Sequence, residues 1–372
     1  MRTLPLLLSA ALLAPFTAAQ AKINDVILKK DGARLRGVEV TEFLLTGVRY
    51  KRGADALELP SHQVAAIEWS DLPESFVAGN AAMARGDFRA ASQLFGDVAS
   101  NRPLVKADAE FFKIKAAVAA VGADKAAAAT AAEHAKKWLG ENANHWRTPE
   151  AMLLAGRAER LAGTGAAAAA TLRELDDKVS RDGLGVIWGA RAKAELAMTL
   201  MADGKAAEAR TSFQSASTAA DAALNTPSAD DAELKALKTL ARVGEGETFL
   251  IEKDFAKAES FFRGLIGSNQ PELVAAGHAG EGEAIFLNAM ANNRPDDLRR
   301  AQLSLANASV LDSQGGEGSA KANYYLGRCL LALGQDREGD TFKQRANAYF
   351  DLVMTAYPTT RWAGLAKTER GQ

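Results

Sequence analysis

Seven helix-breaking positions recur along this 372-residue chain, at intervals of roughly 36 to 49 residues. They are Gly86, Gly122, Gly163, Gly204, Lys253, Asn293 and Gly334. The segments between them are rich in Ala, Leu and Phe at helical spacing, so each interval predicts one hairpin of two helices. One hairpin cannot bury its apolar side alone, whereas stacked hairpins bury a continuous core. The period therefore predicts a helical array, whose extended surface favours a binding function.

The composition places the chain among globular proteins and disfavours two classes of partner. Hydrophobic residues make up 48% and charged residues 24% of the sequence, which argues against intrinsic disorder. The 45 basic and 46 acidic residues give a formal net charge of -1. Because no overall positive field results, we expect neither nucleic acid nor an anionic lipid surface as a partner.

Residues 1–21 have the pattern of a cleaved secretory signal peptide. One basic residue, Arg2, precedes an apolar run from about Leu4 to Phe16, and the segment ends in Ala19-Gln20-Ala21. The run is too short to cross a bilayer core of about 30 Å, so we expect cleavage after Ala21 and no integral membrane segment afterwards. A retained N-terminal anchor is the alternative. The cleavage site lacks a cysteine, which disfavours a lipid anchor, and the pattern predicts a periplasmic location.

A small β domain is predicted over residues 22–70, where the apolar period changes from helical to alternating. Five short apolar runs, separated by turn residues, predict a five-stranded β-barrel or rolled sheet. The domain resembles small SH3-like or Sm-like modules at the front of some secreted bacterial repeat proteins. This resemblance rests on Asp25-Val26-Ile27-Leu28-Lys29-Lys30-Asp31-Gly32, Gly37-Val38, Leu59-Pro60 and Val64-x-x-Ile67-Glu68-Trp69. Two roles stay open: a cap on the first repeat, or an open strand edge that docks a peptide or a cell-wall component.

The clearest repeat lies near the start of the helical region and resembles the tetratricopeptide (TPR) family. It reads Gly79-x-x-Ala82, Gly86-Asp87-Phe88, Ala91 and Phe95. The third, fourth and fifth units repeat this pattern, the units around Gly122 and Asn293 are degenerate, and the last matches only after about seven extra residues. The resemblance covers residues 73–370 and implies a mostly α fold, a TPR-like solenoid of about seven hairpins. The ending AYFDLVMTAYPTTRWAGLAKTER is similar to that of periplasmic repeat proteins of the TolA-associated coordinator and outer-membrane assembly lipoprotein type.

The TPR resemblance also implies a ligand-facing surface, because the first helix of each hairpin lines the concave face in that family. The positions implied to face a ligand are Asn80, Met83, Arg157, Arg160, Met198, Met201, Glu247 and Arg328. Their arginines suit a carboxylate-bearing peptide terminus, and their methionines suit varied apolar side chains. The alternative is that these positions are ordinary solvated helix surface.

No pattern of residues predicts catalysis, a cofactor or a metal ion. His62, His134, His145 and His278 are far apart in the sequence and form no zinc-binding motif. The Gly-Glu-Gly-Glu segments at 244–247 and 280–283 follow no strand, and their acidic residues would repel phosphate, so they are interpreted as close-packing positions.

The remaining conspicuous residues have structural interpretations. The Asp pairs at 230–231 and 296–297 are expected to cap helices, and the pair at 176–177 to lie on a solvated face. Trp138, Trp146 and the pair Tyr324-Tyr325 are expected in the core, with ligand stacking as the alternative. The single cysteine, Cys329, excludes an intramolecular disulfide and is expected to be a buried apolar residue.

These observations together predict a non-enzymatic scaffold or adaptor in the cell envelope. It would bind other envelope proteins or peptides through the concave face of the solenoid, in the setting of envelope assembly. The alternative function is a cell-wall or carbohydrate-binding module that uses the β domain. The partner, the pathway and the oligomeric state have no signature in the sequence.

Overall fold

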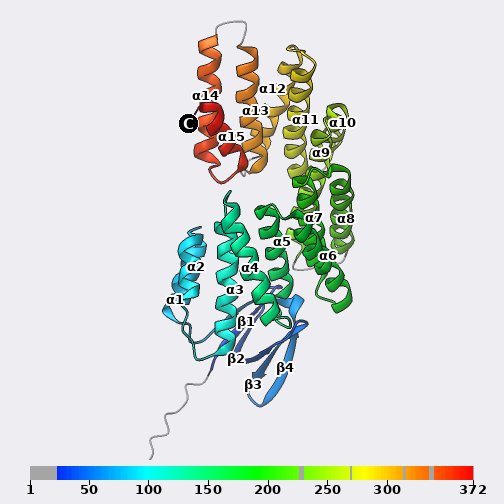
Figure 1. Cartoon of the computed structure of the whole chain (residues 1–372). Coiled ribbons are helices and arrows are strands. Elements are labelled where there is room, and N and C mark those ends of the chain that lie inside the picture. Colours follow the sequence, from blue (N-terminus) through cyan, green and yellow to red (C-terminus); the bar gives the residue numbers. More distant parts are fainter. Residues whose placement is uncertain (1–22, 226–229, 269, 313–315, 335–338, 372) are drawn as a thin grey trace, which may run out of the picture.

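The computed structural model describes residues 23–225, 230–268, 270–312, 316–334 and 339–371. The expected signal peptide, residues 1–21, lies outside these ranges. The described chain begins with a β-sheet and continues as an array of helices (Figure 1).

The sheet contains the five predicted strands, all paired antiparallel with their neighbours. They are β1 (Asp25–Lys29), β2 (Arg34–Phe43), β3 (Gly47–Arg52), β4 (Asp55–Pro60) and β5 (Val64–Glu68), with a short 3-10 helix at Ser61–Gln63 before β5. Their order in the sheet is β4-β3-β2-β1-β5, so β4 and β5 form its two edges. The sheet is therefore open, and the barrel alternative is wrong for these strands.

In the residues that the structure describes, the helical region consists of seven hairpins and one final helix. The first helices are α1 (Glu74–Ala84), α3 (Pro103–Ala120), α5 (Thr148–Ala162), α7 (Val186–Ala202), α9 (Asp231–Ile251), α11 (Pro271–Ala291) and α13 (Glu317–Leu333). The second helices are α2 (Phe88–Gly96), α4 (Lys125–Glu141), α6 (Gly165–Asp182), α8 (Ala206–Leu224), α10 (Phe255–Ile266), α12 (Asp297–Leu311) and α14 (Gly339–Ala356). From α3 onward each first helix also packs against the next first helix, and α15 (Arg361–Arg370) packs on α13 and α14. This is the predicted TPR-like solenoid.

Left-handed backbone conformations mark six of the seven predicted helix-breaking positions. Four are glycines with positive φ, and the other two are Lys253 with φ of 59° and Asn293 with φ of 49°. An L-residue pays a steric penalty in this region, which explains why glycine predominates at these turns. Gly334 also ends a helix, α13, but with a right-handed φ of -82°.

Close helix packing explains the glycines inside the first helices. A Cβ atom on Gly79 would lie 2.8 Å from the Phe95 ring, and one on Gly246 would lie 2.5 Å from the Phe262 ring. In both hairpins the glycine and the aromatic residue are 16 positions apart. Gly156 and Leu172 make the same kind of contact at the same spacing. The mid-helix glycine therefore lets the second helix place a large side chain directly against the first helix.

The sixth and seventh hairpins use the same contact at a longer spacing. Gly282 faces Leu305 and Gly327 faces Phe350, each 23 positions apart instead of 16. Seven residues correspond to about two helical turns. The extension noted in the last unit therefore occurs in the sixth hairpin as well, and this explains why the unit around Asn293 looks degenerate in the sequence.

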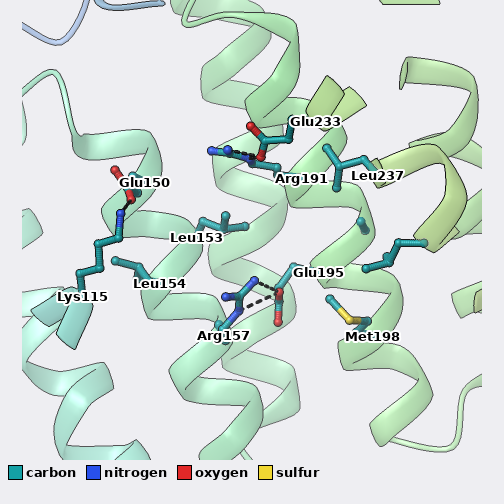
Figure 2. A pocket seen from close by; sticks show the side chains of 12 residues that line it. Lys115, Glu150, Leu153, Leu154, Arg157, Arg191, Glu195, Met198, Glu233 and Leu237 are labelled. Carbon is teal, nitrogen blue, oxygen red and sulfur yellow. Dashed lines mark hydrogen bonds and ion pairs between the residues drawn. The ribbon is translucent and has the colours of Figure 1, made fainter. Parts of the chain in front are cut away.

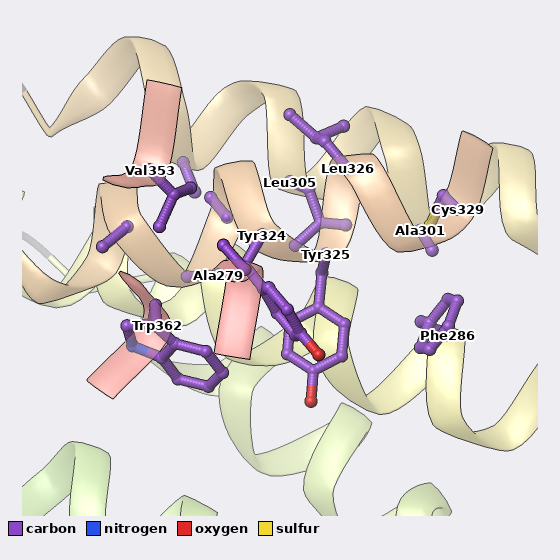
Figure 3. Close-up of a cluster of buried hydrophobic side chains, with 14 of the residues drawn as sticks. Ala279, Phe286, Ala301, Leu305, Tyr324, Tyr325, Leu326, Cys329, Val353 and Trp362 are labelled. Carbon is purple, nitrogen blue, oxygen red and sulfur yellow. The ribbon is translucent and has the colours of Figure 1, made fainter. Parts of the chain in front are cut away.

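Aromatic side chains fill the cores at both ends of the array. In the C-terminal core, Tyr324 and Tyr325 pack against Trp362 with ring centroids 5.5 and 5.8 Å apart (Figure 3). Cys329 is fully buried in the same cluster, and burial raises the pKa of its thiol to about 12. The interpretation of Tyr324, Tyr325 and Cys329 as core residues is confirmed.

The sheet lies along one side of the array, beneath the connections between successive hairpins (Figure 1). Arg102, just before α3, forms an ion pair of 2.5 Å with the buried Asp25 of β1. Phe43 of β2 contacts His145 between α4 and α5, with centroids 4.4 Å apart.

Two further contacts extend this support along the array. His62 packs against Gly185, which lies between α6 and α7. Lys30, after β1, pairs with Asp230 at the start of α9, with Nζ 2.9 Å from Oδ1. The sheet thus touches four successive connections, which is more than the expected cap on the first repeat.

Candidate functional site

A groove of about 300 Å³ lies on the inner face of the array, between the first helices α3, α5, α7 and α9 (Figure 2). We call it the inner groove. It is lined by Lys115, Glu150, Leu153, Leu154, Arg157, Arg191, Ala194, Glu195, Met198, Glu233, Leu237 and Leu240.

The floor of the inner groove is apolar because aliphatic side chains of three first helices line it: Leu153 and Leu154 of α5, Ala194 and Met198 of α7, and Leu237 and Leu240 of α9. Residues four positions apart, such as Ala194 and Met198, share one face of their helix. Leu240 of α9 remains 41% exposed to solvent in the groove. A large aliphatic side chain at this exposure on a concave surface is available to a partner.

Ion pairs between neighbouring first helices cross the groove. Lys115 of α3 pairs with Glu150 of α5 at 2.7 Å, and Arg191 of α7 donates from Nε to Glu233 of α9 at 2.6 Å. Burial would raise the pKa of Glu150, but Lys115 and Arg147 outweigh it and lower that pKa, so the Glu150 carboxyl is ionised at neutral pH. The groove therefore combines an apolar floor with paired charges.

Two arginines of α5 share one buried carboxylate at the centre of the groove. Glu195 of α7 is 1% exposed; its Oε2 accepts from Nε and Nη2 of Arg157 at 3.1 and 3.0 Å. Its Oε1 accepts from Nε of Arg160 at 2.9 Å. The Arg157 side chain is 45% exposed, whereas that of Arg160 is 20% exposed. Two cations on one anion leave a local excess of positive charge.

The structure brings together three of the eight residues that the sequence selected. Arg157 and Met198 line the inner groove, and Arg160 joins them through Glu195. The other five lie elsewhere: Asn80 is exposed on α1, Met83 and Met201 are half-buried against separate cores, and Glu247 and Arg328 belong to the C-terminal half. A protein-binding role for any of them stays a prediction.

Sequence reasoning missed the acidic partners and two of the cations. Glu195 and Glu233 each lie about one repeat after the arginine that they bind, at separations of 38 and 42 residues. Lys115 and Glu150 are separated by 35 residues. Opposite charges that recur once per repeat are therefore a usable signal, because the same face of successive first helices meets across the groove.

A second charged cluster closes the inner face of the C-terminal half. Lys321 of α13, 6% exposed, places Nζ 2.8 Å from both Glu247 of α9 and Glu283 of α11. The Tyr325 hydroxyl donates to Glu283 at 2.7 Å, and Arg361 of α15 lies 3.3 Å from Glu247. Burial would raise the pKa of Glu247, but Lys321 and Arg361 lower it. Glu247 is thus engaged in ion pairs within the fold.

The histidines occupy separate structural positions in the parts of the chain described. Nδ1 of the buried His145 accepts from the backbone N–H of Arg147 at 3.0 Å. Burial, assisted by Arg147, lowers the pKa of His145 to about 3, so this imidazole is neutral. Within the described residues, no three His, Cys, Asp or Glu side chains gather as metal ligands would.

Trp138 and Trp146, which were named for stacking, do not offer open ring faces, and neither do Trp69 and Trp362. Trp69 at the end of the sheet is 6% exposed, and Trp146 is 8% exposed. Trp138 and Trp362 are 3% exposed each. A carbohydrate site built on these rings would need them uncovered, so the observed burial gives that alternative function no support.

Comparisons with known proteins show only distant likenesses. No protein-family model and no curated protein matches the chain. Among solved structures, the apo form of RapI has a TM-score of 0.48 and 11% identity over 80% of each chain. The C-terminal part of a TPR repeat-containing protein from Cytophaga hutchinsonii has a TM-score of 0.40 and 11% identity, over 78% of this chain and 98% of that one.

No helix among the described residues combines the length and the apolar character that a membrane span requires.

Proposed function

We propose that this protein is a non-enzymatic scaffold or adaptor of the cell envelope that binds a segment of another protein in the inner groove. The observation that carries the proposal is the apolar floor on the inner face of α3, α5, α7 and α9, bordered by ion pairs, where Leu240 is 41% exposed and Leu153, Met198 and Leu237 are half-buried. Ligand sites are typically concave, mainly apolar and furnished with a few polar groups that fix orientation.

The other half of the inner face is less suited to a ligand. There Lys321 joins α9, α11 and α13, and the Trp362 ring of α15 covers Tyr324 and Tyr325. Because these groups satisfy one another within the fold, we assign binding to the N-terminal half.

Site-specific photo-crosslinking tests the groove. A photoreactive residue in place of Leu240, 41% exposed in the groove, is expected to form an adduct with a partner protein in cells. The matched control replaces Leu303, 67% exposed on α12 and outside the groove. Equal adduct yields at both positions, or an adduct at Leu303 alone, would rule out specific binding in the groove.

The envelope location is supported by the signal-peptide pattern of residues 1–21. Intact-mass analysis of the protein from the periplasmic fraction is expected to show a chain that begins at Lys22. Recovery in the cytoplasm with residues 1–21 attached would contradict the location and leave the groove unaffected.

A further inference from the structure

We propose that the inner groove selects a peptide segment that carries one carboxylate between aliphatic side chains, and that Arg157 binds this carboxylate. This inference rests on the proposed function and specifies the chemistry of the partner at the same site.

The charges in and beside the groove do not cancel. Four cations meet three anions: Lys115, Arg157, Arg160 and Arg191 against Glu150, Glu195 and Glu233. The nearby Arg147 adds one cation and its closest partner Asp108 adds one anion, with Nε 2.6 Å from Oδ1, so the pair leaves the difference unchanged; Nη1 of Arg147 also lies 3.6 Å from Glu150. Within the groove, the excess cation is located at Glu195, whose carboxylate Arg157 and Arg160 share. An acidic group in a ligand would complete the balance.

The two arginines at Glu195 are not equivalent. Arg160 places Nη2 2.8 Å and Nε 2.9 Å from Oε1 of Glu195, and its side chain is 20% exposed, so it can keep the buried carboxylate paired by itself. Arg157 is 45% exposed, and its Nε and Nη2 both reach a single oxygen, Oε2. A guanidinium has five N–H donors in a planar fork, so Arg157 has capacity for a second carboxylate. Arg157 is therefore the ligand-facing member of the pair.

The surroundings of Arg157 determine what must flank that carboxylate. Leu153 lies one turn before Arg157 on α5, and Met198 lines the groove from α7 (Figure 2). Leu240 of α9 lines the same groove. Aliphatic side chains next to a ligand carboxylate would cover this floor, and their burial would exclude water and strengthen the ionic hydrogen bonds. A ligand with basic side chains would instead meet the excess positive charge.

Two matched peptides test the inference: acetyl-Leu-Leu-Glu-Leu-Leu-amide and the same peptide with Gln in place of Glu. Binding to the full chain is followed by NMR of methyl-13C-methionine, and the Met198 signal is identified through Met198→Leu. We expect both peptides to shift the Met198 signal, and the Glu peptide to bind about tenfold more tightly, as for hydrogen bonds to charged groups.

Variants locate the effect. Arg157→Gln is expected to weaken the Glu peptide about tenfold and to leave the Gln peptide unchanged. Arg173→Gln, at an exposed position on α6 outside the groove, is the matched control and is expected to change neither affinity. Thermal melting of both variants checks that the fold persists.

The outcomes separate the inference from the proposed function. If both peptides bind equally at Met198, or if Arg157→Gln weakens both alike, the groove stands and carboxylate selection is refuted. If neither peptide shifts the Met198 signal, the groove does not bind such segments and the proposed function fails with it.

Discussion

Replacing Lys321 by Met tests how the C-terminal half is held together. The Nζ atom lies 2.8 Å from Glu247 and from Glu283, and the side chain is only 6% exposed. At an effective dielectric constant near 20, each contact represents about 6 kcal/mol of Coulomb attraction, offset by several kcal/mol of desolvation per ion. The intact cluster therefore contributes little net free energy to stability, whereas removal of its buried cation destabilises the fold.

The stability lost in Lys321→Met depends on which partners Glu247 and Glu283 keep. Glu247 keeps Arg361 at 3.3 Å, whereas Glu283 keeps only the Tyr325 hydroxyl among its described partners. Breaking a buried ion pair on one side costs about 3–5 kcal/mol, and we expect a loss of this size for Lys321→Met. Adding Glu283→Gln should recover at least about 2 kcal/mol, because a neutral amide costs less to bury and still accepts from Tyr325.

Hydrogen exchange read by mass spectrometry over α13 is the suitable assay, because repeat arrays need not unfold in a single step. Lys367→Met, at an exposed position on α15, is the control and should stay within about 0.5 kcal/mol of the parent. If Lys321→Met matches this control, the reasoning about buried charge here is refuted.

Three further predictions concern single side chains. The folded-state pKa of His145 is lowered to about 3, so stability should fall by about 1.4 kcal/mol per pH unit as the pH drops below about 6.5. His145→Leu should remove about 2 kcal/mol of the loss between pH 6.5 and 4.5. Equal losses of unfolding free energy in the parent and in the variant, measured by denaturation at both pH values, would contradict this. Lys253→Gly should raise stability by about 0.5–1 kcal/mol, because glycine adopts the left-handed backbone conformation without a steric penalty. Gly204→Ala, where a Cβ meets nothing within 4 Å, should lower stability by about 1 kcal/mol. Local hydrogen exchange measures both changes, and changes of the same sign would count against the backbone argument. Gly246→Ala should cost about 1–3 kcal/mol in chemical denaturation, because its Cβ would lie 2.5 Å from the buried Phe262 ring, and unchanged stability would show that the ring can move.

The sequence allowed the hairpins to be predicted because each turn has a local cause. Gly86, with its left-handed φ, and Gly79, against Phe95, impose fixed requirements on the side chain at their own positions. The extension of the sixth hairpin escaped notice because Gly282 and Leu305 are 23 positions apart, outside the spacing of the other units.

The groove and the position of the sheet were harder to predict, because they depend on distant contacts. Arg157 was selected, but its partner Glu195 lies 38 residues away and carries no local signal. Likewise, nothing near Lys30 in the sequence indicates that it meets Asp230, 200 residues later. Such contacts follow from the accumulated rotation of the array, which a single repeat does not encode.

The sheet beneath the array restricts how this protein can change its length in evolution. A solenoid ordinarily tolerates the gain or loss of a repeat, because each repeat contacts only its neighbours. Here Arg102 and Lys30 attach the sheet at α3 and at the start of α9, so a hairpin inserted between those points would carry Asp230 away from Lys30. We expect duplications to be accepted after α9 and rejected before it, so that the part of the array containing the inner groove keeps a fixed number of repeats.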